Sequence, residues 1–208
     1  MQQLTLYAIA IDDVRDIFGA HPELASRLRR VAAEHFAAPT PPKKRWFKPL
    51  LRTDADSVVD PVKPSGDDVE ILLAGGFIKP ERAAQSWAIL SAWLQHLATR
   101  WRAIPFERAA FERIEWDLAR AGLNSDYSLR NLAERDLATP LRPLPDTFAG
   151  YAKHVHVVET LAALRDARHN HDLAPETVAF VDPILDVLAA VPSDERLDLV
   201  ATVCDASD

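Results

Sequence analysis

Two histidines and an aspartate near the C-terminal third of the chain could bind a metal ion. His169, His171 and Asp172 follow one another closely in the sequence, and Zn²⁺ takes imidazole nitrogens and carboxylate oxygens as ligands. An irregular turn at a helix end could bring these three side chains together and support metal-assisted hydrolysis. The alternative is that both histidines are exposed at a helix C-terminus, where the helix dipole favours positive charge. His154 and His156 are expected inside a helix, point apart, and would not share an ion.

The segment 39–65 combines repeated prolines with a basic, aromatic cluster and is expected to be a long loop or linker. Cations interleaved with aromatic rings are typical of contacts with nucleic acids or other anionic surfaces. The alternative, which we favour, is that the two aromatic side chains pack the loop against the core while the cations stay solvated. The cluster consists of Lys43, Lys44, Arg45, Trp46, Phe47, Lys48 and Arg52.

Carboxylates and nucleophiles give no complete catalytic motif. Glu112 and Glu115 are three residues apart and share a helix face, as a pair for acid–base chemistry would. Arg108 and Arg113 lie among them, which favours an ion-paired, solvated face instead. Cys204 is the only cysteine, and no histidine is close to it in sequence. The chain contains no Gly-x-Ser-x-Gly, GxGxxG or P-loop pattern, so no cofactor is predicted.

Tryptophans are the most distinctive apolar residues of the predicted helices. Trp87 and Trp101 follow the three- and four-residue spacing of a buried helix face. Trp93 lies at the edge of that face. It either widens the buried surface or is an exposed aromatic anchor for a protein partner. Trp46 and Phe47 are the other candidates for contact with a protein partner.

The elements that would position these residues are mainly helices. Leu4, Leu6 and Ala8 alternate with the β-forming residues Thr5, Tyr7 and Ile9. This period of two predicts a strand over 3–10 with both faces at least partly buried. From residue 65 onward the spacing of apolar residues, together with Gly and Pro punctuation, predicts helices almost to the end of the chain. The predicted helical ranges are 12–18, 22–36, 66–74, 80–102, 106–121, a short piece over 128–132, 146–168, a helix framed by Pro175 and Pro183, and a last short helix through Leu199 and Val203.

We therefore expect a mostly α protein, a single compact helical domain with a short N-terminal β-strand element. Residues 1–38 form the strand-helix element and 39–65 the proline-rich basic loop or linker. Residues 66–208 form a helical core, one domain together with 1–38.

Composition limits the function classes. The chain has 208 residues and a formal net charge of −7, which argues against the whole protein being a nucleic-acid binder. No apolar run is long enough to span a membrane, and the N-terminus does not resemble a signal peptide. A single cysteine fits a reducing compartment, so a cytoplasmic location without a membrane partner is expected.

Three segments together resemble a known family. These are the opening Leu6-Tyr7-Ala8-Ile9, the helix Phe111-Glu112-Arg113-Ile114-Glu115-Trp116-Asp117, and the proline-rich stretch Pro143-Leu144-Pro145-Asp146-Thr147-Phe148-Ala149-Gly150-Tyr151. With the helix over 88–102, they are similar to a family of actinobacterial proteins of about this length, catalogued as a domain of unknown function. The resemblance covers roughly residues 4–18 and 87–165. It implies a compact, largely helical protein and transfers no catalytic residue.

The sequence as a whole favours a non-enzymatic module that binds another protein. No coherent catalytic site is evident, aromatic residues are in surplus, and an acidic surface favours a basic partner. Immunity or antitoxin factors and regulatory proteins belong to this class. The alternatives are a metal-assisted hydrolase using residues 169–172 and a nucleic-acid contact through residues 43–52. Oligomeric state is left open.

Overall fold

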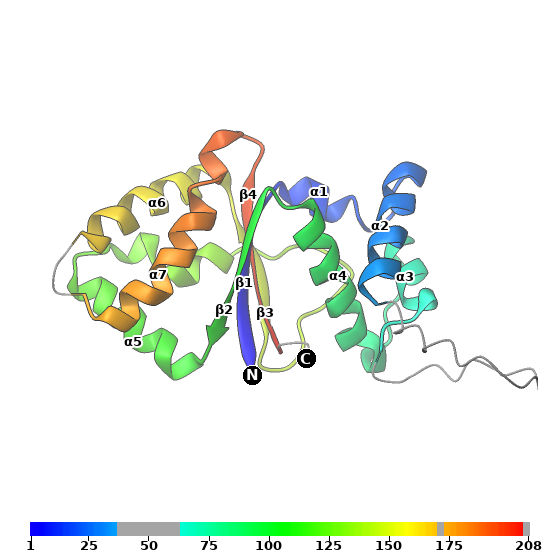
Figure 1. Ribbon diagram of the computed structural model, residues 1–208, viewed down its shortest axis with the longest axis horizontal. Helices are drawn as coiled ribbons and strands as arrows, with labels where there is room; N and C mark the ends of the chain where they lie inside the picture. The colour runs from blue at the N-terminus through cyan, green and yellow to red at the C-terminus, as the bar shows by residue number, and fades with distance from the viewer. Residues whose placement is uncertain (37–62, 170–172, 206–208) are drawn as a thin grey trace, which may run out of the picture.

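The protein is built around a four-stranded antiparallel sheet with the strand order β2-β1-β4-β3. The computed structural model describes residues 1–36, 63–169 and 173–205. The strands are β1 (Gln2–Ile9), β2 (Arg100–Phe106), β3 (Phe148–Ala152) and β4 (Asp198–Asp205). Figure 1 shows the sheet between two helical layers, with α1 to α4 on one face and α5 to α7 on the other.

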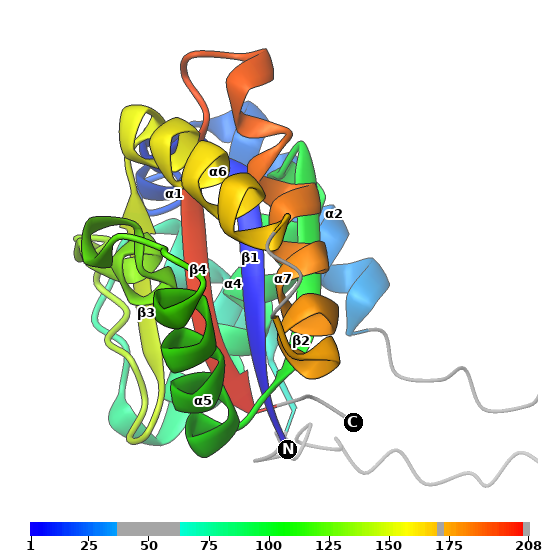
Figure 2. The same cartoon turned by 90° about the vertical axis from the view of Figure 1, so that its left-hand side faces the viewer.

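Each helical layer belongs to one half of the chain. The connection from β1 to β2 forms α1 (Ile11–Arg15), α2 (Pro22–His35), α3 (Gly66–Leu73), the short 3₁₀ helix η1 (Pro80–Arg82) and α4 (Ala83–Leu97). The remainder forms α5 (Arg108–Arg120), the 3₁₀ helices η2 (Ser125–Tyr127) and η3 (Leu129–Ala133), α6 (His154–Arg168), α7 (Pro175–Leu188) and η4 (Val191–Ser193). Figure 2 looks onto the face that α5, α6 and α7 cover.

The prediction of a mostly helical domain with a single N-terminal strand is wrong. Three further strands pair with β1 or with each other, and the fold is mixed α and β. The segment 100–106, expected to end one helix and begin the next, is the edge strand β2. The segments 148–152 and 198–205, also expected to be helical, are β3 and β4.

Strand β4 was missed because its sequence carries little periodicity. Leu199, Val200, Ala201, Thr202 and Val203 are all at most 2% exposed, because β4 lies between two strands with helices on both faces. A short, continuous apolar run cannot be assigned to helix or strand by its period alone. Long-range pairing with β1 therefore decides its conformation.

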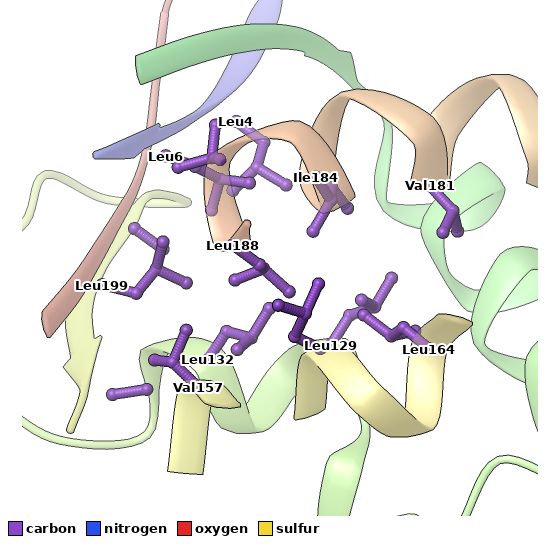
Figure 3. Packing of buried hydrophobic residues seen from close by; sticks show 14 of the residues in the cluster. Leu4, Leu6, Leu129, Leu132, Val157, Leu164, Val181, Ile184, Leu188 and Leu199 are labelled. Carbon is purple, nitrogen blue, oxygen red and sulfur yellow. The ribbon is translucent and has the colours of Figure 1, made fainter. Parts of the chain in front are cut away.

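Alternation along β1 divides the hydrophobic core into two clusters. Leu4, Leu6 and Ala8 pack with the cluster under α5, α6 and α7, whereas Tyr7 and Ile9 pack with the cluster under α1 to α4. This is the period of two expected for a strand with two buried faces. Figure 3 shows Leu4 and Leu6 beside the side chains of α7 in the first cluster.

Several helices begin and end at or near the residues that the sequence predicts. Ser65 and Asp68 form a capping box at the start of α3, which satisfies backbone N–H groups that have no partner inside the helix. Gly19, Gly75 and Gly122 follow α1, α3 and α5 with positive φ angles, the conformation that glycine adopts without strain.

A proline-rich connector, residues 140–147, leads into the edge strand β3. Leu141 is buried in the cluster under α1 to α4, and the carbonyl of Arg142 accepts a hydrogen bond from Trp87 Nε1 at 2.8 Å. The connector ends at β3, whose first residue, Phe148, contacts Phe106 on the opposite face. The connector thus joins the two layers.

Candidate functional site

An apolar cavity of about 270 Å³ opens on the face of the sheet that α5, α6 and α7 cover. Its floor consists of sheet residues, and its walls are α5, η3 and α7. The residues around it are Leu4, Leu6, Phe106, Arg108, Phe111, Glu112, Leu129, Arg130, Leu132, Ala133, Asp146, Phe148, Ile184 and Ala201. Most of these side chains are aliphatic or aromatic, which is typical of sites for small molecules.

Three phenylalanines from different elements meet at the cavity. The ring centroid of Phe106 lies 5.5 Å from that of Phe111 and 6.0 Å from that of Phe148, the latter pair edge to face. Phe148 is 36% exposed, so part of this aromatic wall is open to solvent. These three rings offer both ring faces and ring edges to the cavity. An aromatic ring bound there could make offset or edge-to-face contacts with them.

Charged side chains occur only at the solvent-exposed mouth of the cavity. Arg108 and Glu112 extend from the first turns of α5, Arg130 from η3 and Asp146 from the connector. Arg108, Phe111 and Glu112 share one face of α5 because residues three and four apart are neighbours on a helix. The mouth therefore carries two positive and two negative groups around an apolar interior.

Three of these four charges have no partner within the described residues. No hydrogen bond or ion pair there involves the side chains of Arg108, Glu112 or Asp146, and Asp146 takes part only through its carbonyl, which accepts from Gln2 Nε2. Arg130 lies 3.9 Å from Glu115 and over the ring of Phe111.

The helix η3, which forms one wall, is held in place by Glu115. The Glu115 carboxylate accepts hydrogen bonds from the Ser128 hydroxyl and, at 2.7 Å, from the Leu129 backbone N–H. Both donors lie at the start of η3, where backbone N–H groups have no helical partner. Glu115, one of the two candidates for acid–base chemistry, is thus a capping residue, while Glu112 lies at the cavity mouth.

A second, polar hollow of about 190 Å³ lies on the opposite face of the sheet, under α4. Its floor includes Tyr7, which is fully buried. Burial raises the pKa of Tyr7 to about 12, although hydrogen bonds with Ser91, Thr202 and Thr5 act in the opposite direction. The phenol therefore stays neutral at physiological pH.

The structure places Trp93 in the core rather than on a binding surface. Its side chain is fully buried in the cluster under α1 to α4, and its Nε1 donates to the Leu28 carbonyl at 2.8 Å. Of the two roles that the sequence allows, Trp93 therefore has the packing role and presents no surface to a partner. Trp101 lies on β2 and is 37% exposed.

The remaining predicted site residues fall mostly outside the described residues. His169 is exposed at the end of α6, and its Nδ1 contacts the Arg165 carbonyl. His171 and Asp172 lie outside the described residues, and so does the whole basic, aromatic cluster: Lys43, Lys44, Arg45, Trp46, Phe47, Lys48 and Arg52. Across residues 1–36, 63–169 and 173–205, no group of three or more His, Cys, Asp or Glu side chains could hold a metal ion.

No helix in the part of the chain that the structure describes is both long enough and apolar enough to cross a membrane. Comparison with known proteins gives no relative: the chain matches no protein-family model, no curated protein and no solved structure. The resemblance noted from the sequence therefore stays a prediction, and the function must be argued from the site itself.

Sequence reasoning missed the cavity because its walls come from distant segments. Phe106 and Phe148 are far apart in the chain and meet only because β2 and β3 lie in one sheet. The available signal was the spacing of Arg108, Phe111 and Glu112, which places an aromatic ring between opposite charges on one helix face.

Proposed function

We propose that this protein binds a small ligand whose apolar part enters the cavity between the sheet, α5 and η3. The observation that carries the proposal is the composition of the cavity: an aliphatic and aromatic interior with charges confined to the mouth. Such a site excludes water from an apolar group and leaves polar groups at the entrance to set orientation. The volume of about 270 Å³ lies just below the range usual for ligand pockets, so the ligand is small.

Ethylbenzene tests whether the cavity accepts an apolar guest. We expect binding to the full-length protein, seen as perturbed NMR signals of the methyl groups of Leu4, Leu129 and Ile184. Ala133→Leu adds a larger side chain to the half-buried Ala133 at the cavity wall and should abolish binding.

Ala110→Leu is the matched control, because Ala110 is also half-buried but lies outside the cavity. It should leave ethylbenzene binding unchanged. Absence of any guest-induced change in the wild type, or equal binding by Ala133→Leu, would refute the proposal.

Protein binding, the function that the sequence favours, is a second candidate and has its own supporting observation. Phe77 is 82% exposed and stands beside a groove of about 580 Å³ that the Gly75–Pro80 loop and the Pro140–Pro145 connector line. A large exposed aromatic next to an apolar groove is typical of a protein contact.

A photo-cross-linking amino acid placed at position 77 in living cells tests this second candidate. We expect one specific cross-linked adduct with a partner protein. Excess wild-type protein without the cross-linker should reduce the amount of this adduct. The same substitution at Trp116, which is 68% exposed and remote from the groove, should not give this adduct. Identical adduct patterns at both positions, or none at either, would count against a partner at Phe77.

The other two functions that the sequence allows stay predictions, because most of their key residues lie outside the described parts of the chain. Stoichiometric Zn, Mn or Fe in untagged protein would support a metal-assisted hydrolase using His169, His171 and Asp172. Salt-sensitive nucleic-acid binding that Lys43/Lys44/Arg45→Ala abolishes would support the other. A cytoplasmic location is part of our proposal, supported by a sequence with a single cysteine, which fits a reducing compartment.

A further inference from the structure

The charges at the cavity mouth narrow the chemistry of the ligand. The mouth holds two guanidinium groups, those of Arg108 and Arg130, and two carboxylates, those of Glu112 and Asp146. A ligand with only a carboxylate would lie close to Glu112 and Asp146, and a ligand with only an ammonium would lie close to the arginines. Either arrangement places like charges together, which is unfavourable.

These charged groups are available to a ligand because most of them have no partner in the fold. Within the described residues, the side chains of Arg108, Glu112 and Asp146 have no hydrogen-bond or ion-pair partner. Arg108 is the first residue of α5, where the helix dipole disfavours a cation, so its position gives the helix no electrostatic stabilisation.

Asp146 adds a backbone constraint at the same mouth. Its φ angle is 60°, in the left-handed region that glycine, asparagine and aspartate adopt more readily than other residues. Its carbonyl is bound by the Gln2 side chain at 3.0 Å, which fixes the connector against the first residues of β1. The backbone therefore places Asp146 beside the cavity, and its carboxylate has no partner of its own among the described residues.

From this arrangement we infer that the ligand is a free α-amino acid with a large apolar side chain, aromatic side chains being favoured. The inference rests on the proposed function. The side chain enters the cavity among Phe106, Phe111 and Phe148, with offset or edge-to-face ring contacts. The ligand carboxylate pairs with Arg108 and Arg130, and the ligand ammonium pairs with Glu112 and Asp146. A zwitterionic ligand thus gives both the arginines and the carboxylates at the mouth a partner of opposite charge. A free amino acid is also small enough for a cavity of about 270 Å³.

Calorimetric titration of the full-length protein with L-phenylalanine and three analogues tests the inference. L-Phenylalaninamide lacks the carboxylate, N-acetyl-L-phenylalanine lacks the ammonium, and ethylbenzene lacks both. We expect L-phenylalanine to bind more tightly than either blocked form by about fivefold or more, as expected for one lost pairing at an exposed site.

Variants at the mouth should act on one end of the ligand only. Arg108→Gln should weaken the binding of L-phenylalanine about fivefold. It should not weaken the binding of L-phenylalaninamide, which has no carboxylate to pair with Arg108 and whose ammonium is repelled by that arginine. Glu112→Gln should weaken the binding of L-phenylalanine but not that of N-acetyl-L-phenylalanine, whose carboxylate is repelled by Glu112. Arg113→Gln, on the same helix but away from the cavity, is the control and should change none of these affinities.

The outcomes separate the inference from the proposed function. If ethylbenzene binds and Ala133→Leu blocks it, but L-phenylalanine binds no better than its blocked forms, the cavity binds apolar ligands and the amino-acid inference is wrong. If the affinity for L-phenylalanine is unaffected by both mouth variants, the inference is also wrong. If neither ethylbenzene nor L-phenylalanine binds, the proposed function fails together with the inference.

Discussion

The carboxylate of Asp198 accepts a hydrogen bond from the backbone N–H of Ile11 at 3.1 Å, although 187 positions separate the two residues. The same carboxylate accepts from the His154 backbone N–H at 3.0 Å and lies 3.3 Å from Lys153 Nζ. It is almost fully buried. Asp198 therefore caps the first turns of α1 and α6 and joins the two helical layers at the start of β4.

Replacing Asp198 should destabilise the whole domain. Asp198→Ala leaves the N–H groups of Ile11 and His154 without an acceptor, which should lower the free energy of unfolding by about 2–4 kcal/mol. Urea denaturation followed by circular dichroism measures this. Asp182→Ala removes an exposed pair with Arg168 and should cost less than about 1 kcal/mol. A similar decrease in the free energy of unfolding in both variants would contradict the role of Asp198 as a cap of both helices.

Gly150 should tolerate no larger side chain. A Cβ at this position would lie 2.1 Å from the carbonyl oxygen of Ala133 and 2.9 Å from that of Arg135. Both atoms are backbone, so Gly150→Ala must push η3 away from β3, at a cost of about 3 kcal/mol. Because Ala133 also lines the cavity, this variant should weaken ethylbenzene binding as well.

The matched control for Gly150 is Gly66, the first residue of α3, where nothing lies within 4 Å of an added Cβ. Gly66→Ala should be neutral or slightly stabilising, because alanine reduces the entropy of the unfolded chain. Thermal denaturation of both variants gives the comparison. A Gly150→Ala protein as stable as Gly66→Ala would show that η3 does not pack against β3 as described.

Trp93 should contribute to stability and not to recognition. Trp93→Phe removes the hydrogen bond to the Leu28 carbonyl and leaves space in a fully buried site, so it should lower the free energy of unfolding by about 1–3 kcal/mol. Trp116→Phe, at an exposed position, should change it by less than about 0.5 kcal/mol. Chemical denaturation monitored by tryptophan fluorescence distinguishes them, and equal effects would place Trp93 outside the core.

Tyr7 should make stability fall at high pH. Its folded pKa of about 12 lies above the ordinary value for tyrosine of about 10, so the neutral phenol stabilises the fold below pH 10. That contribution is lost as pH rises from about 10 to 12, and it amounts to about 2–3 kcal/mol.

Tyr7→Phe isolates this contribution. The variant lacks the titrating group, so its free energy of unfolding should fall less steeply between pH 10 and 12 than that of the wild type. The difference in ultraviolet absorbance between the two proteins reports Tyr7 alone, since Tyr127 and Tyr151 are present in both. A Tyr7 phenol that ionises near pH 10 in the folded protein would refute the buried, hydrogen-bonded environment.

The sequence by itself determined the local structure where a segment carries its own signal. Alternation over β1 predicted a strand with two buried faces, Ser65 marked the start of α3, and Gly122 marked the end of α5. These features depend on period, capping and φ angle, which are properties of neighbouring residues. For the same reason, Trp93 could be placed on a helix, although its burial could not.

Tertiary structure alone decided the sheet and the cavity. The helix predicted over 80–102 keeps its apolar spacing as far as Trp101, yet α4 ends at Leu97, and Thr99 donates to the Ala8 carbonyl to begin the pairing of β2 with β1. Strand pairing joins residues that are far apart in sequence, and its hydrogen bonds and burial outweigh local helix propensity. Phe106, Phe111 and Phe148 form a cavity only after that pairing has brought them together, so the candidate site exists in the fold and in no single segment of the chain.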